Sequence, residues 1–260
     1  MAVQQAIKSQ LAKLLATEDI VVEHKQVSSA QFNVRTRVLI LPLWEKASHD
    51  VYDMLVGHEV GHALFTPDKD WWLDHDIPQQ FVNLVEDARI EKLMKRKYMG
   101  LAKSFYKGYS ELHDKDFFEI DGQDISSLNL ADRANLHFKL CSILSVSFSA
   151  PEKEIITLIQ NAETFTETLS AAEALYNFCK QEQDSRRDSK EEEKKAQLDF
   201  EQDLESSGDL DLSSTSDSEA SISDIDSGSP VEDRSDSSSS DDRVEDPDPG
   251  VTTAEKQIIT

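Results

Sequence analysis

The segment Gly57-His58-Glu59-Val60-Gly61-His62 contains the pattern His-Glu-x-x-His, which in zinc peptidases binds a metal ion and activates water. Side chains four positions apart in a helix lie one turn apart on the same face. We therefore expect His58 and His62 to direct two imidazoles at one metal ion. Glu59 is rotated by about 100° from His58, so we expect it to act as a general base and not as a ligand. This chemistry is metal-assisted hydrolysis.

The flanking sequence predicts that this motif lies in a helix. Ser48 is a suitable N-cap, no proline occurs between His49 and Phe65, and Thr66-Pro67 supplies a stop. Two glycines within the motif lower helix propensity by roughly 1 kcal/mol each. We expect these small residues to permit the close approach of a neighbouring strand or helix.

A catalytic zinc ion usually has three protein ligands and a water, so a third ligand is required. The next predicted helix, Gln79 to Tyr98 with Pro78 at its start, offers candidates. Within it, Asn83, Glu86, Asp87 and Ile90 follow the spacing of one helix face.

Glu86 is our first choice for the third ligand. Asp87 is the alternative ligand, or an acid that orients a ligating histidine through its free ring N–H. The competing interpretation places both carboxylates on an exposed helix, paired with Arg89 and Lys92. The sequence leaves these alternatives open.

Two segments, Val56 to Pro67 and Asn83 to Glu91, together resemble zincin-like metallopeptidases of large tailed bacteriophages. They are also similar to a region of proteins related to the cobalt-chelatase accessory subunit. The stretch from Gln31 to Trp44 resembles the strand region of the phage group, so the resemblance covers roughly residues 20–120. It implies a zinc site of the glutamate type in which the second segment supplies the acidic ligand.

Composition divides the 260-residue chain into two parts. The net charge is −24, and the segment 181–260 alone contains 25 acidic and 8 basic residues. Its Ser, Asp and Glu content is too polar to bury a core, so we expect a disordered acidic tail there. Residues 186–198 are predicted to extend the preceding helix. Residues 1–180 are long enough for one domain with its own core.

Charge and hydropathy also exclude some partners and compartments. An acidic chain without a strong basic stripe is not expected to bind nucleic acid, and no apolar run is long enough for a membrane span. No signal peptide is recognised. Cys141 and Cys179 are expected to be reduced core residues. These features favour a cytoplasmic protein, in the host cytoplasm if it is phage-encoded.

The expected fold of residues 1–180 is α+β, dominated by helices around a small sheet. We predict a helix over Ala2 to Ala16 and strands over Ile20 to Glu23 and Gln31 to Leu43, with Pro42 at a sheet edge. Later helices are predicted over Ala131 to Phe148 and Pro151 to Gln181.

The sequence thus predicts a zinc metallopeptidase with Zn²⁺ held by His58, His62 and Glu86, acting on a protein or peptide substrate. Candidates for stabilising the oxyanion are His75, Tyr98, Tyr106, Tyr109 and His113. The Trp71-Trp72 pair is expected to cover the core or to line the cleft. The alternative function is a non-catalytic zincin-fold module that docks a protein partner through its acidic tail.

Overall fold

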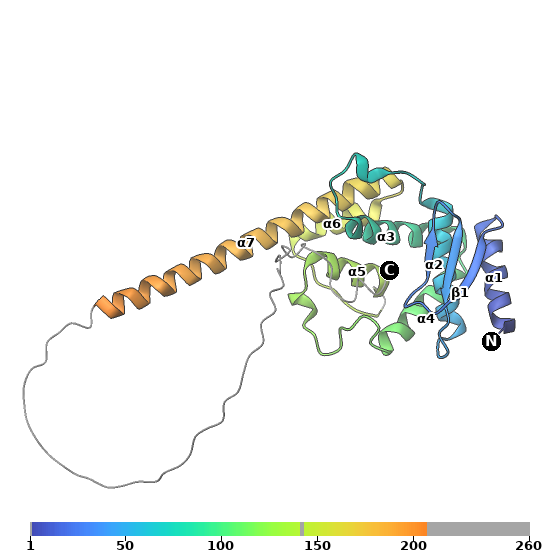
Figure 1. Cartoon of the computed structure of the whole chain (residues 1–260), viewed down its shortest axis with the longest axis horizontal. Helices are drawn as coiled ribbons and strands as arrows, with labels where there is room; N and C mark the ends of the chain where they lie inside the picture. The colour runs from blue at the N-terminus through green and yellow to red at the C-terminus, as the bar shows by residue number, and fades with distance from the viewer. Residues whose placement is uncertain (1, 141–142, 207–260) are drawn as a thin grey trace, which may run out of the picture. The chain divides into compact units, whose positions relative to one another are not determined.

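Helices dominate the computed structural model, which describes residues 2–140 and 143–206, and its one small sheet has three strands. This confirms the predicted α+β class (Figure 1). The elements are α1 (Ala2–Ala16), β1 (Val21–Lys25), β2 (Gln31–Asn33), β3 (Val38–Pro42), α2 (His49–Phe65), η1 (Trp71–Leu73), α3 (Gln79–Lys97), α4 (Leu101–Asp114), η2 (Ile125–Ser127), α5 (Leu130–Leu140), α6 (Ala150–Asn161) and α7 (Phe165–Ser206).

The sheet has the order β1-β3-β2, with β1 parallel and β2 antiparallel to β3. The structure differs from the sequence prediction at two points of this sheet. The segment from Gln31 to Leu43 is a hairpin and not one strand, and Pro42 ends the central strand, opposite Lys25, and not an edge strand. The proline is tolerated because it is the last residue of β3.

The turn of this hairpin contains neither glycine nor proline, which explains why it was missed. The side chain of Asn33 accepts hydrogen bonds from the backbone N–H groups of Arg35 and Thr36 at 3.0 and 2.8 Å. Arg37 completes the turn in the left-handed region at φ 57°. Its guanidinium also donates to the carbonyl of Ala63 at 2.8 Å, which ties the hairpin to α2.

Helix α2 begins and ends as predicted. The Ser48 hydroxyl accepts from the N–H of Val51 at 3.2 Å, and Thr66 is the C-cap. The two glycines also permit the expected close approaches. A Cβ on Gly61 would lie 2.7 Å from Ile90 Cδ1 on α3, and a Cβ on Gly57 would lie 3.2 Å from Phe105 on α4.

Helix α3 lies between two hydrophobic cores. One core gathers α1, β3, α2 and α4, and Met94 is the α3 residue within it. The other core packs the first half of α3, through Phe81 and Val85 among others, against α5, α6 and α7. Both faces of α3 are therefore held by other helices, which fixes its rotation about its own axis.

The later helices differ in their bounds from the prediction. Helix α5 ends at Leu140 among the described residues, and the segment from Ile143 to Phe148 is not helical. The predicted long helix from Pro151 divides into α6 and α7, because Ala162–Thr164 break it. Ser149 and Glu152 form a capping box at the start of α6, with Pro151 in the first turn as expected.

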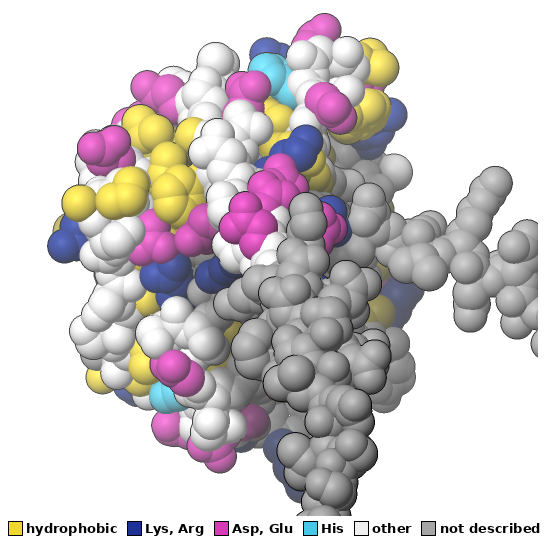
Figure 2. Space-filling view, turned by 90° about the vertical axis from the view of Figure 1, so that its left-hand side faces the viewer, with side chains coloured by type: hydrophobic (Ala, Val, Ile, Leu, Met, Phe, Trp, Pro, Cys, Tyr) yellow, Lys and Arg dark blue, Asp and Glu magenta, His cyan; other side chains and the backbone are white. Residues whose placement is uncertain are grey.

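The contacts divide the described chain at Asp184, and a second unit begins at Ser185. Helix α7 continues to Ser206, so the predicted helical extension over 186–198 is confirmed, whereas the disorder predicted for the other residues of 181–206 is wrong. The rest of the predicted tail lies outside the described residues, as does Cys141. Cys179 is a buried core residue, as predicted. On the face shown in Figure 2, acidic and basic side chains are interspersed with hydrophobic ones. Among the described residues, no helix combines the length and apolar character that crossing a bilayer requires.

The contact of α4 with α2 at Gly108 predicts a large cost for one methyl group. A Cβ at Gly108 would lie 2.8 Å from Met54 Cβ and 3.2 Å from the carbonyl of Asp50. We expect Gly108→Ala to lower the free energy of unfolding by about 1–3 kcal/mol, despite the gain in helix propensity. Urea denaturation measures this. Gly100→Ala is the control, because a Cβ there meets nothing within 4 Å; an equal loss in both variants would contradict the packing argument.

The buried ion pair between Arg133 on α5 and Glu152 on α6 joins two helices of the core that α3 forms with α5, α6 and α7. We expect this pair to make the stability of the protein sensitive to acid. Arg133 binds both carboxylate oxygens of Glu152, which also accepts from the N–H of Ser149 at 2.7 Å. The hydrogen bonds from Arg133 lower the pKa of Glu152 from 4.5 to about 2, against the effect of burial. Its stabilisation is therefore complete above the unfolded pKa and is lost as pH falls through the folded pKa.

We expect Glu152→Gln to destabilise the protein at pH 7 and the difference from wild type to shrink between pH 4.5 and about 2. Denaturant titrations across this range measure it. Glu154→Gln, at an exposed position of the same helix, should leave the stability curve unchanged. A difference for Glu152→Gln that does not vary with pH would contradict the assignment.

Candidate metal centre

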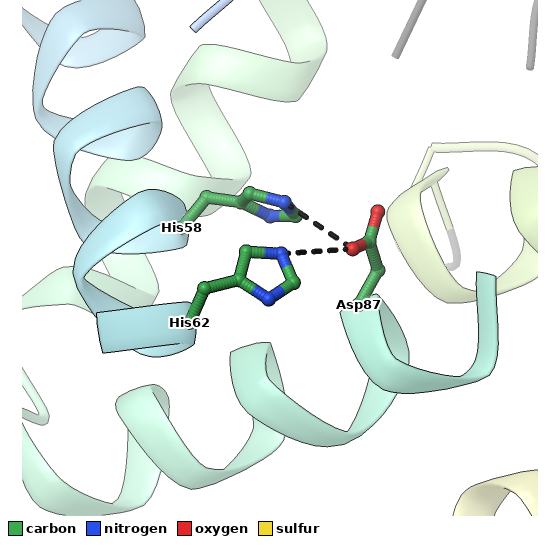
Figure 3. A group of neighbouring side chains, drawn as sticks. All are labelled: His58, His62 and Asp87. Carbon is green, nitrogen blue, oxygen red and sulfur yellow. Dashed lines mark ion pairs between the residues drawn. The ribbon is translucent and has the colours of Figure 1, made fainter. Parts of the chain in front are cut away.

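Two histidines of α2 and one aspartate of α3 converge in the interior. His58 Nε2 and His62 Nε2 lie 3.4 and 3.2 Å from Asp87 Oδ1, so one carboxylate oxygen faces both rings (Figure 3). The imidazole rings are arranged edge to face, with centroids 5.1 Å apart. One donor atom from each residue lies within 4.8 Å of the others.

These distances suit a metal ion. Two donors about 2.1 Å from a metal ion and separated by a tetrahedral angle lie roughly 3.3–3.4 Å apart. Both measured Nε2–Oδ1 separations are close to that value. Two imidazoles and a carboxylate also form the donor set of many catalytic zinc sites. The group can therefore hold a metal ion, and its donor set fits zinc.

Glu91 orients His58. His58 Nδ1 lies 3.1 Å from Glu91 Oε1, and the same carboxylate accepts from Tyr109 Oη and from Lys95 Nζ. Burial opposes the charge on Glu91, but Lys95 and His58 outweigh it and lower its pKa to about 2. Burial and Glu91 raise the pKa of Tyr109, so its hydroxyl remains a donor. Glu91 is thus an anion that accepts a hydrogen bond from the Nδ1–H group of His58.

A chain of hydrogen bonds through Thr66 to Glu86 orients His62. His62 Nδ1 lies 3.0 Å from Thr66 Oγ1, and the Thr66 hydroxyl donates to Glu86 Oε1 at 2.5 Å. Because the hydroxyl has one proton and gives it to Glu86, it accepts from His62 Nδ1–H. Arg89 holds Glu86 in place with hydrogen bonds of 2.8 and 2.6 Å. Both histidines therefore carry a proton on Nδ1, which leaves Nε2 to face the metal position.

Protons and a metal ion compete for this position. Burial opposes a charge on His58, but Asp87 and Glu91 outweigh burial and raise its pKa to about 10. Lys139 and His58 hold the pKa of Asp87 well below its usual value, against the effect of burial. The two opposite charges satisfy His58 Nε2 and Asp87 Oδ1, and a bound metal ion would displace the Nε2 proton.

The structure brings Asp87, the alternative ligand, to the histidines and not Glu86. The two residues are neighbours, and their side chains leave the helix about 100° apart. The rotation of α3 directs Asp87 at the rings, whereas Glu86 turns towards Arg89 and accepts from Thr168 Oγ1 at 3.1 Å. The Arg89 pairing suggested by the sequence is therefore present for Glu86, but it is buried and not exposed.

Glu59 lies beside the metal position. Its side chain is buried and lines the same cleft as His58, His62 and Asp87. Burial raises the pKa of Glu59, with the charges of His58 and His62 acting in the opposite direction. A carboxylate so placed can accept a proton from a water molecule in the cleft.

The cleft has a volume of about 440 Å³ and opens over the three converging side chains. One wall is β2 and its turn, and another is the start of α3, with Val82 and Asn83. Arg35 donates to Asp68 at 3.0 Å and also binds Asp70, which joins the hairpin turn to the loop after α2. Trp71 and Trp72 both line the cleft, and Trp71 also packs against the second core.

None of the five candidate oxyanion residues lines this cleft. The Tyr98 hydroxyl donates to the carbonyl of Leu15, the Tyr109 hydroxyl binds Glu91, and Tyr106 is 52% exposed. Among the polar side chains that line the cleft, Asn83 is well placed to stabilise an oxyanion, because it lies one turn before Asp87 on α3.

Three residues of the site were missed: Thr66, Glu91 and Lys139. Glu91 lies four positions after Asp87, so the spacing of the acidic face could have indicated it. Thr66 was assigned only to the helix stop. Lys139 contacts Asp87 from a helix 52 positions away, and no local pattern signals that contact.

No protein family, curated protein or solved structure matches this chain.

The geometry predicts different metal contents for two neighbouring variants. Asp87→Asn removes the anionic donor at the histidine pair, so we expect the purified protein to lose its metal. Glu86→Gln weakens the Thr66 contact that orients His62 and the buried pair with Arg89, but it removes none of the three converging donors. Metal should therefore be retained with affinity lowered by about 10- to 100-fold. Elemental analysis and competition with a chromophoric chelator measure both. Loss of metal in Glu86→Gln with retention in Asp87→Asn would restore Glu86 as the ligand.

Proposed function

We propose that the protein is a zinc-dependent peptide hydrolase of the zincin type. The observation that carries this proposal is the convergence of His58 Nε2, His62 Nε2 and Asp87 Oδ1 beside Glu59 on the wall of one cleft. Three protein donors leave room for a further ligand, which is the arrangement of catalytic and not of structural zinc sites. The resemblance of the two motif segments to phage zincin-like proteins supports the same class.

The residues of the chain have separate tasks in this reaction. Zinc, when bound, polarises a carbonyl oxygen and lowers the pKa of a water molecule. The Glu59 carboxylate accepts a proton from the attacking water and returns it to the leaving amine nitrogen. Glu91 and the Thr66–Glu86 pair hold the imidazoles in the required tautomer and orientation throughout.

The cleft suits an extended peptide. Strand β2 is at one edge of the sheet, and its residues line the cleft. A substrate strand can therefore pair with the open edge of β2, while side chains contact the walls. Val82 and Phe165 offer apolar contacts, and the Asn83 amide can donate to a substrate carbonyl. The volume of about 440 Å³ accommodates a few residues.

Replacing the general base tests the catalytic assignment. We expect Glu59→Gln to retain zinc and to lower turnover of denatured casein or a peptide library by about 10²- to 10⁴-fold, because the amide cannot accept the proton. Glu173→Gln, at an exposed position of α7, is the matched control and should keep full activity. Zinc content is measured in every sample, so loss of metal is distinguished from loss of the base.

Equal, chelator-insensitive turnover by wild type and Glu59→Gln would contradict the peptidase proposal. Capture of a protein partner that survives Glu59→Gln and weakens on deletion of residues 181–260 would instead favour the binding module considered from the sequence.

A further inference from the structure

Lys139 is a buried lysine in direct contact with the candidate metal centre. It lies on α5 between Leu136 and Leu140, which belong to the first core, and its side chain is only 3% exposed. Burial of an ammonium group is costly unless a partner compensates for it. The partner is Asp87, whose Oδ2 lies 2.9 Å from Lys139 Nζ.

The two oxygens of Asp87 therefore face different groups. Oδ1 lies 3.4 and 3.2 Å from the Nε2 atoms of His58 and His62, and Oδ2 accepts from Lys139. Carboxylates bind metal ions through one oxygen or through both. A carboxylate whose second oxygen is held by a buried ammonium group has only one oxygen left to offer.

We propose that Lys139 is a positioning residue that restricts Asp87 to one metal-coordinating oxygen and so preserves an open coordination position on the metal. This inference rests on the proposed function, because it concerns the same centre. Lys139 would act only through Asp87, whose Oδ2 it contacts.

The contact with Lys139 has an electrostatic consequence as well. The ammonium charge draws electron density from Asp87, so the carboxylate becomes a weaker donor and leaves more positive charge on the metal. Lys95 provides a comparison within the same centre. Its Nζ lies 3.0 Å from Glu91 Oε2, and Glu91 contacts His58 but is not itself among the converging donors. Removal of Lys95 therefore changes the local charge without freeing an oxygen of Asp87.

Cobalt substitution of the full chain tests the proposal without an enzymatic assay. Co²⁺ replaces zinc, and its visible d–d bands are intense at low coordination number and weak at high coordination number. We expect intense bands in the wild type. Lys139→Met should lose this intensity, because Asp87 gains a second coordinating oxygen. Lys95→Met removes a cation without freeing an oxygen of Asp87, so its bands should stay more intense than those of Lys139→Met. Lys103→Met, at an exposed position of α4, is the control and should keep the wild-type spectrum. Lys139→Arg, which retains a cation, should restore the wild-type intensity.

Casein turnover is a second readout. We expect Lys139→Met to lower it by about 10- to 100-fold at unchanged metal content. A spectrum of Lys139→Met identical to that of wild type would overturn the role of Lys139 and leave the peptidase proposal intact. Failure of wild type to bind Co²⁺ or Zn²⁺ would overturn both.

Loss of a buried cation could also unfold the chain, so the wild type provides an independent measurement. Zinc X-ray absorption of wild type should give a coordination shell with a single oxygen from a carboxylate at bonding distance. A shell with a bidentate carboxylate would overturn the proposal whether or not Lys139→Met folds.

Discussion

Helix α3 carries buried carboxylates, and their need for partners organises the centre of the molecule. Glu86, Asp87 and Glu91 are between 3% and 5% exposed. A buried ion without a partner costs several kcal/mol, so each acid requires donors, and each has at least one from outside α3. Arg89 and Thr66 serve Glu86, the histidines and Lys139 serve Asp87, and Tyr109 and Lys95 serve Glu91. Helices α2, α4 and α5 are thereby linked to one helix.

The local parts of this arrangement could be predicted. Helix α2 from Ser48 to Thr66 depends on a cap, a stop and an uninterrupted apolar pattern, all of which lie within the segment itself. The orientation of His58 and His62 on one face follows from helix geometry alone. The bounds of α3 also agree with the expectation to within one residue, because its signals likewise lie within the segment itself. Pro78 is the N-cap and not the first helical residue.

The choice between neighbouring carboxylates could not be predicted in the same way. Glu86 and Asp87 each offer a carboxylate, and which of them meets the histidines depends on the rotation of α3. That rotation is set by contacts distant in sequence: Ile90 against Gly61 on one side, and Phe81 and Val85 against α5 to α7 on the other. The hairpin turn and the order of the sheet were likewise hidden, because an asparagine side chain and a left-handed arginine replace the usual glycine.

The spacing of these residues along the chain has a consequence for biosynthesis. The converging donors and Glu91 lie on consecutive helices, with His58 and Glu91 only 33 positions apart. Lys139 follows Asp87 by 52 positions. A ribosome that synthesises the chain from its N-terminus therefore exposes all three converging donors well before Lys139. The nascent protein acquires the means to capture a metal ion early, whereas the surroundings that govern how Asp87 presents its oxygens are completed only after α5 has joined the fold.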